Sequence, residues 1–313
     1  MPELKAGEAS LGVQAGDVNL KVQAGEVNLR VQAGEVSLAW RQWGEGDTIV
    51  LFIHGNLASK DWIELAAPHF PRGVRTIAID WRGCGDSDKP AALPDFSNYS
   101  IAQHADDMLA ALDALDIGFC HLATHSTGGI ISTRMLLKQP ERFGRVFSLS
   151  PVGPQGLAFT QENIALFARM KASRDFTRYI MALTAPSLFE PDSLAAGAPR
   201  FRSGIGDRAG LFDHIVEQVC AVSDGIWFGT PDTLTKEAAS GELKAQMGSI
   251  PHPHLVVWGM NDGVIPEADL KEMAALMPHC RFVAVPGIGH CLNLEAPEIY
   301  AGYFGAWFGG LSG

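Results

Sequence analysis

The chain has 313 residues, of which 47% are hydrophobic and 19% are charged, proportions typical of a globular protein with a large core. Its net charge of −11 argues against nucleic acid or an anionic membrane as the main partner. The five cysteines are widely spread and include no Cys-x-x-Cys pair, which predicts reduced thiols in a cytoplasmic protein, with no disulfide framework and no zinc site. The N-terminus lacks a signal-peptide pattern, and no apolar run approaches the length needed to cross a membrane.

A nine-residue repeat occupies the N-terminal region, with copies at residues 13–21, 22–30 and 31–39 and a looser copy at 4–12. Polar and apolar residues alternate strictly from Val27 to Gln32, which predicts one-sided strands closed by Ala-Gly-Glu turns. Consecutive copies would pair as an antiparallel meander, so we expect residues 1–35 to extend one edge of the main sheet. Duplication without a new function is the simplest explanation, and formation of a homo-oligomer through this edge is the alternative.

Residues 48–53 are apolar throughout, as expected for a strand buried on both faces, and they end in the pair His54-Gly55. A glycine there lets the backbone turn sharply, so that the amide of Asn56 or Leu57 can point into the space above the sheet. Paired with the amide of Thr127, this amide would form an oxyanion hole. We select Asn56 and Thr127 as its residues.

A second buried strand is predicted by the apolar run that ends at Thr124, and apolar residues resume at helical spacing from Ile130. Ser126 therefore stands at a corner between a strand and a helix, in the outline of a nucleophile elbow. So tight a turn needs small residues two positions to either side, where this chain has Thr124 and Gly128. On these residues alone, the alternative is a helix with a capping serine and packing glycines.

The segment between these two motifs carries a family resemblance. A predicted strand at 74–80 leads into Asp80-Trp81-Arg82-Gly83-Cys84-Gly85-Asp86-Ser87, which closely resembles the Asp-x-Arg-Gly-x-Gly-x-Ser turn of the α/β-hydrolase family. The His54-Gly55 turn and the elbow at Ser126 stand where that family has them. The resemblance implies an α/β fold with a mostly parallel, doubly wound sheet. We expect this core at 36–150 and 251–313, interrupted by a helical cap at 151–250.

The predicted cap differs in character from the core, because turn residues are frequent, apolar positions are helically spaced and aromatic residues recur. An apolar roof over a pocket would exclude water and favour an organic substrate with ring or alkyl character. The cap is also a candidate surface for self-association. We select Leu57, Trp62, His125 and Trp227 as candidate substrate-binding residues, with packing in the core as the alternative for both tryptophans.

Two further candidate residues follow the cap. Asp262 comes just past a predicted strand at 254–259, at the rim where α/β sheets keep their sites, and it is the acid position of the family's Gly-x-x-Asp-x-x-x-Pro pattern. His290 lies in the loop after the last predicted strand, 281–286, and completes the family's chain order of Ser, Asp and His. The resemblance therefore implies that Ser126 is the nucleophile, His290 the base and Asp262 the orienting acid.

These residues predict a serine hydrolase that cleaves a carboxylic ester or lactone of a small organic substrate through an acyl-serine intermediate, without a metal or other cofactor. Dehalogenases and epoxide hydrolases of the family use an aspartate at the elbow, which Ser126 excludes. A C–C bond hydrolase, a cofactor-free oxygenase or a perhydrolase is the alternative within the same fold. The alternative from another class is a small-molecule receptor that retains the triad.

Overall fold

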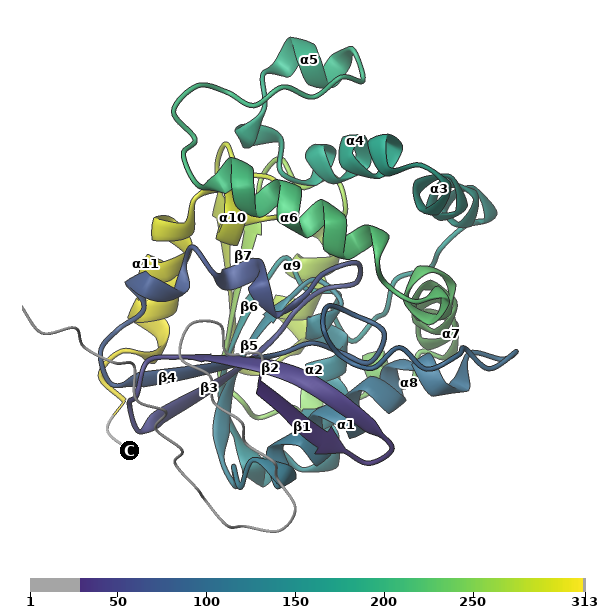
Figure 1. Cartoon of the computed structure of the whole chain (residues 1–313). Helices are drawn as coiled ribbons and strands as arrows, with labels where there is room; N and C mark the ends of the chain where they lie inside the picture. The colour runs from purple at the N-terminus through teal and green to yellow at the C-terminus, as the bar shows by residue number, and fades with distance from the viewer. Residues whose placement is uncertain (1–28, 312–313) are drawn as a thin grey trace, which may run out of the picture.

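The computed structural model describes residues 29–311, and an eight-stranded sheet forms its centre (Figure 1). The strand order is β1-β2-β4-β3-β5-β6-β7-β8; β2 is antiparallel to both β1 and β4, and every other neighbouring pair is parallel. The predicted mostly parallel α/β fold is confirmed. The strands are β1 (Leu29–Ala33), β2 (Val36–Trp43), β3 (Thr48–Ile53), β4 (Val74–Ile79), β5 (Cys120–His125), β6 (Phe143–Leu149), β7 (His254–Gly259) and β8 (Cys280–Val285).

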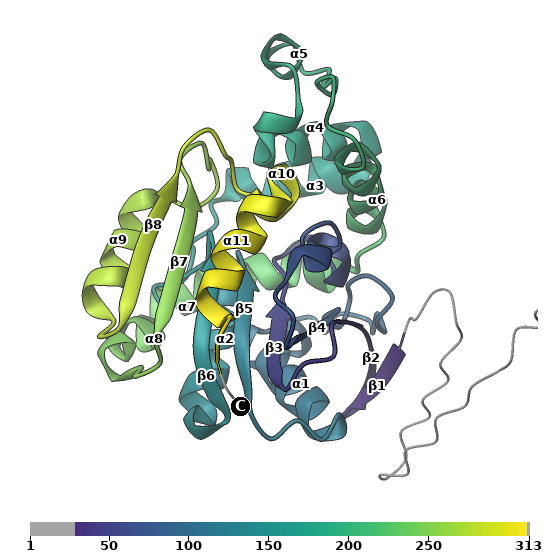
Figure 2. The ribbon, with the colours of Figure 1, turned by 90° about the vertical axis from the view of Figure 1, so that its left-hand side faces the viewer.

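Helices cover both faces of this sheet. The helices α1 (Ile101–Ala114) and α2 (Gly128–Lys138) pack against each other on one face, and α11 (Pro297–Phe308) lies on the opposite face (Figure 2). The helix α9 (Glu267–Leu276) connects β7 to β8, and the short helix α10 (Leu292–Glu295) precedes α11. Among residues 29–311, no helix is both long and apolar enough to span a membrane.

The last part of the N-terminal repeat forms a β-hairpin. Ala33 pairs with Val36 across a turn at Gly34 and Glu35, and the pairing continues to Leu29 opposite Trp40. The turn predicted at Ala33-Gly34-Glu35 is present, and most of the pairing joins the two halves of the single copy at 31–39. The copies before Leu29 lie outside the described residues, so their addition to the sheet stays a prediction.

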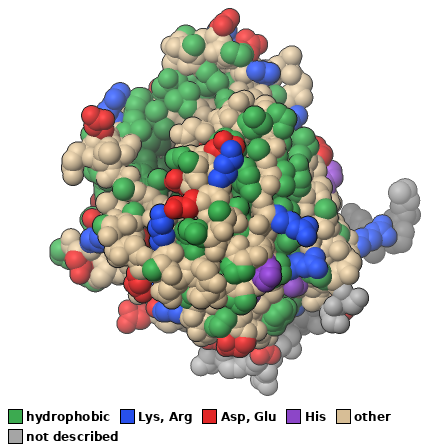
Figure 3. Space-filling model, turned by 180° about the vertical axis from the view of Figure 1, so that it is seen from behind, with side chains coloured by type: hydrophobic (Ala, Val, Ile, Leu, Met, Phe, Trp, Pro, Cys, Tyr) green, Lys and Arg blue, Asp and Glu red, His purple; other side chains and the backbone are tan. Residues whose placement is uncertain are grey.

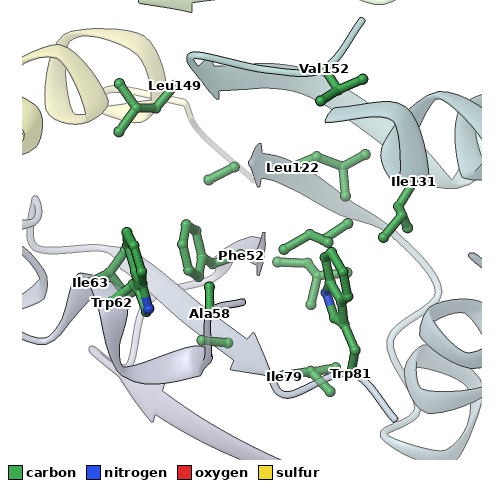
Figure 4. Packing of buried hydrophobic residues seen from close by; sticks show 14 of the residues in the cluster. Phe52, Ala58, Trp62, Ile63, Ile79, Trp81, Leu122, Ile131, Leu149 and Val152 are labelled. Carbon is green, nitrogen blue, oxygen red and sulfur yellow. The ribbon is translucent and has the colours of Figure 1, made fainter. Parts of the chain in front are cut away.

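Large aromatic side chains fill the core below the carboxyl ends of the central strands. Phe52 of β3 lies between Trp62 and Trp81 in the close view, and Leu122 of β5 packs beside them (Figure 4). All four side chains are buried. Since β3 is covered on both faces, it needs apolar residues at nearly every position, which explains its apolar run from Ile49 to Ile53.

The long connection between β6 and β7 is helical. It contains α3 (Gln161–Ala172), α4 (Arg174–Thr184), α5 (Pro191–Ala195), α6 (Arg208–Cys220), α7 (Thr230–Ser240) and α8 (Glu242–Ala245). The helices α3, α4 and α6 lie over the carboxyl ends of the strands, whereas α7 and α8 lie lower, beside the core (Figure 1). In the view from behind, hydrophobic side chains surround a hollow in the upper part of the molecule (Figure 3). Of the helices in the predicted cap, α3, α4 and α6 therefore roof the strand ends.

Candidate active site

Ser126 occupies the sharp turn between β5 and α2. Its φ angle is 52°, in the left-handed region that L-residues rarely adopt, so the backbone here is strained. Gly128 passes so close to β3 that an added Cβ would overlap the carbonyl oxygen of Ile53, which explains the glycine. Thr124 is buried, and its hydroxyl donates a hydrogen bond to Ser148 Oγ of β6, at 2.9 Å. The strand-to-helix corner predicted at Ser126 is present.

The loop after β3 runs beside this turn. A Cβ on Gly55 would lie 2.9 Å from Cβ of Ser126, so the two segments can approach only at a glycine. Leu57 also has a left-handed φ of 51°. His54 holds the turn, since its Nδ1 donates to the Gly55 carbonyl at 2.8 Å and its Nε2 accepts from the Trp81 amide at 3.2 Å. Burial lowers the pKa of His54 to about 3, so this imidazole is neutral near pH 7.

His290 and Asp262 are in contact, as their predicted roles require. The ring Nδ1–H of His290 donates to Oδ2 of Asp262 at 2.8 Å. The other carboxylate oxygen, Oδ1, accepts hydrogen bonds from the amides of Val264, at 2.7 Å, and Ile265, at 3.1 Å. Burial disfavours the charged form of Asp262, but the His290 ring and the two amides outweigh burial and lower the pKa of this carboxyl. Asp262 is therefore a carboxylate that orients the imidazole.

The loops that carry these two residues are joined by their backbones. The Asn261 amide donates to the carbonyl of Ile288 at 2.8 Å. Gly259, at the end of β7, lies where an added Cβ would overlap the carbonyl oxygen of Gly289. The loops after β7 and β8 can therefore run side by side only because residue 259 is a glycine.

His125 contacts the His290 loop directly, which the sequence did not indicate. Its Nε2–H donates to the backbone carbonyl of His290 at 3.1 Å, and its ring lies 4.7 Å from the His290 ring and 5.2 Å from the Trp62 ring, between centroids. Burial places the pKa of His125 well below its usual value, so the ring is neutral. His125 lines the cavity, as a substrate-binding residue would, and it also holds the backbone of His290.

A cavity of about 360 Å³ lies above the elbow. Its core wall includes Ser126, His290, Asn56 and Thr127, so the predicted nucleophile, base and oxyanion-hole residues face one space. The predicted Leu57, Trp62 and His125 also line it. Its cap wall is largely apolar and includes Leu157, Phe159, Leu166, Phe167, Ile180 and Met181. Among the described residues that line the cavity, none is Asp, Glu, Lys or Arg.

Trp227 is the predicted substrate-binding residue that the structure places elsewhere. It belongs to a short π-helical segment, η6 (Gly225–Gly229), and is completely buried behind the cavity wall. Its ring meets that of Phe167 edge to face, with centroids 6.3 Å apart, and Phe167 is the residue that faces the cavity. The prediction is corrected: Trp227 supports the wall and does not form it.

The comparisons with known proteins agree with this geometry. The family described as alpha/beta hydrolase fold matches residues 48–297. The chain belongs to the α/β-hydrolase fold family. Its sheet order, elbow and paired loops after β7 and β8 are thus features of a family member.

Individual relatives of this α/β-hydrolase are distant. A dihydrolipoyllysine-residue acetyltransferase component of an acetoin cleaving system from Pseudomonas putida is 27% identical to this chain. The match covers 82% of this chain but only 62% of the relative's length. A 2-(acetamidomethylene)succinate hydrolase from Mesorhizobium japonicum is 27% identical, covering 83% of this chain and 87% of the relative. The solved structure of an esterase from Exiguobacterium antarcticum has a TM-score of 0.72 at 19% identity, covering 90% of this chain and 99% of that one. The likeness to that structure concerns the fold.

Sequence reasoning missed several residues of the site. Ile180 and Met181 on α4 line the cavity, although their only sequence signal was an apolar face at helical spacing. Glu295 was also missed; it is buried behind the His290 loop, and only a carboxylate shortly after that histidine could have drawn attention to it. Within residues 29–311, no group of three or more His, Cys, Asp or Glu side chains is arranged to hold a metal ion.

Proposed function

We propose that this α/β-hydrolase cleaves a carboxylic ester or lactone of a small organic molecule through an acyl-serine intermediate. The observation that carries the proposal is that Ser126 and His290 line one cavity while Nδ1 of His290 is hydrogen-bonded to Asp262, whose side chain is buried. This is the arrangement of nucleophile, base and orienting acid that acyl transfer needs.

The first half-reaction uses the tautomer that Asp262 selects. Because Nδ1 of His290 carries the proton shared with Asp262, Nε2 has a lone pair that can accept the hydroxyl proton of Ser126. The serine oxygen attacks the ester carbonyl as this proton leaves. The carbonyl oxygen becomes an anion, and the amides of Asn56 and Thr127 stabilise it. Removal of one such donor typically lowers turnover by about 10²–10³-fold.

The imidazolium then protonates the leaving alkoxide, and the acyl group stays on Ser126. In the second half-reaction His290 takes a proton from water, whose oxygen attacks the acyl-serine, and the acid departs as Ser126 regains its proton. For a lactone, the leaving alkoxide and the acyl group belong to one molecule, so a single hydroxy acid is released.

The cavity lining supports an uncharged substrate. An anionic acyl group would need a lysine or arginine to offset the loss of its hydration, and the described lining contains neither. We therefore infer an apolar, neutral acyl or ring group packed against Phe159 and Phe167. The relative from Mesorhizobium japonicum is named for a succinate-derived substrate, which differs in charge from the substrate inferred for this chain.

The deciding experiment measures p-nitrophenyl ester and lactone hydrolysis by wild type and Ser126→Ala. We expect turnover by wild type and an acyl adduct on Ser126 by mass spectrometry, both lost in the variant. Tight ligand binding with negligible turnover would instead favour the receptor alternative, and cleavage of a vinylogous 1,5-diketone in preference to all esters would favour the C–C hydrolase.

Substrate charge is tested by placing a cation in the cavity wall. Ile180 lines the cavity, whereas Leu183 lies on the same helix, is 42% exposed and does not line it. We expect Ile180→Lys to raise relative activity toward anionic monoesters over neutral esters, and Leu183→Lys to leave the ratio at its wild-type value. A wild-type preference for the anionic monoesters would contradict the inferred neutrality.

A further inference from the structure

A buried carboxylate lies behind the His290 loop. Glu295 is the last residue of α10, and only 2% of it is exposed. Its Oε1 accepts hydrogen bonds from the amides of Gly289, at 2.9 Å, and Cys291, at 3.3 Å, which flank His290 in the chain. Its Oε2 accepts a hydrogen bond from the amide of Ser187, at 3.0 Å. One side chain thus joins the His290 loop to the segment that follows α4.

The segment after α4 contacts the same loop directly. The backbone amide of His290 donates to the carbonyl of Thr184, the last residue of α4, at 2.9 Å. From the start of α6, Arg208 Nη1 donates to the backbone carbonyl of Glu295 at 2.8 Å. Bonds from two cap helices and their connection therefore converge on the loop. A displacement of residues 184–187 would displace the backbone of His290.

Glu295 is a buried carboxyl that is held by hydrogen-bond donors and, in the part of the chain that the structure describes, has no cationic partner. Burial raises the pKa of this carboxyl, and the side chain of Ser187 and the amides of Ser187, Gly289 and Cys291 oppose that shift. Among the ion pairs formed within residues 29–311, none includes Glu295, so its partners are uncharged donors, three of them backbone N–H groups. A buried carboxyl bonded to three amides orients the backbone that carries them, a task that an apolar side chain of similar size cannot perform.

We infer that Glu295 is a positioning residue, which couples residues 184–187 of the cap to the His290 loop, so that His290 is aligned with Ser126 only while the cap is seated. This inference rests on the proposed function, because alignment matters only if His290 is the base. One carboxylate bonds both segments: Oε1 holds the His290 loop and Oε2 holds the cap segment.

Two substitutions separate these sides. Glu295→Ala removes both sets of hydrogen bonds. Glu295→Gln retains an oxygen that can accept from Gly289 and Cys291, but its amide nitrogen then meets the Ser187 N–H, donor against donor. The matched control is Glu237→Gln, which alters a half-buried carboxylate of α7 that is paired with Arg134.

Hydrogen exchange measures the coupling without requiring catalysis. We expect Glu295→Ala to accelerate exchange of peptides covering both 184–188 and 287–291 by about 10-fold or more, because local opening becomes easier. Glu295→Gln should accelerate the 184–188 peptide more than the 287–291 peptide, and Glu237→Gln neither. Unchanged exchange at 287–291 in the alanine variant would overturn the inference, as would equal acceleration of both peptides in the glutamine variant.

Kinetics then tests the consequence for His290. With folded protein well below its melting temperature, Glu295→Ala should lower kcat for ester hydrolysis by about 10²-fold, as expected for a misplacement of about 1 Å, with KM changed far less. Glu295→Gln should lower kcat less than Glu295→Ala does, because the His290 loop keeps its own hydrogen bonds while the cap segment is released. A loss of thermal stability with wild-type kcat would reduce Glu295 to a structural residue. A wild type inactive on every ester would overturn the proposed function, and the exchange comparison would still decide the coupling.

Discussion

The strain at Ser126 predicts that the chain becomes more stable when its nucleophile is replaced by glycine. An L-residue in the left-handed region is destabilised by about 1–2 kcal/mol, because its Cβ crowds the following carbonyl. Glycine has no Cβ, so Ser126→Gly removes this strain at φ 52°. Greater freedom of glycine in the unfolded chain offsets about 0.4–1 kcal/mol of the gain. We expect a net difference of about 0.5–1 kcal/mol.

The comparison that isolates this effect is Ser126→Gly against Ser126→Ala, since neither variant has the hydroxyl and they differ by one methyl group. For a chain of this size, about 1 kcal/mol corresponds to a shift of about 2 °C in Tm, which differential scanning calorimetry resolves. Both variants should be inactive toward esters.

An ordinary helical position supplies the control. Ala168 is exposed within α3, where Ala168→Gly should instead lower the free energy of unfolding by about 1 kcal/mol. Glycine in place of alanine should raise the free energy of unfolding at residue 126 and lower it at residue 168. This opposite effect identifies backbone strain at residue 126 as the cause. If the alanine variant at residue 126 is as stable as the glycine variant or more so, the strain argument is refuted.

Three more predictions concern charge. Asp262→Asn should lower kcat/KM for ester hydrolysis by about 10⁴-fold, because it favours the wrong tautomer of the base, and an activity within tenfold of wild type would contradict its assigned role. Burial lowers the pKa values of His54 and His104 to about 3, so below pH 6.5 the unfolded chain binds protons that the folded chain does not. As the pH falls from 6.5 to about 3, each histidine should therefore lower the free energy of unfolding by about 1.4 kcal/mol per pH unit. In urea unfolding at pH 7, 6 and 5, the free energy of unfolding of His104→Phe should fall less steeply with pH than that of wild type. Lys60→Met leaves the buried carboxylate of Asp80, 3.0 Å away, without its cation, and should lower the free energy of unfolding by about 3–5 kcal/mol in the same assay at pH 7.

The local part of the site was readable from sequence because it depends on neighbours in the chain. The corner at Ser126 follows from a strand, a small residue and a helix in immediate succession, and the turn at His54-Gly55 follows in the same way. The segment from Asp80 to Ser87 resembles a turn of the family. That resemblance set the expected chain order of the remaining site residues, because the fold connects its strands in one way. Asp262 and His290 were predicted to lie together on that ground, and they are hydrogen-bonded.

Contacts between distant segments were decided by the tertiary structure. Periodicity shows that a cap aromatic lies on an apolar face, but it does not show what that face meets, so Phe167 faces the cavity and Trp227 lies behind it. The hydrogen bond from His125 to the carbonyl of His290 spans 165 positions, and that from Ser187 to Glu295 spans 108. Chain-local preferences determine where strands and turns form, whereas the direction and partner of a buried polar side chain depend on packing between elements, which no local pattern encodes.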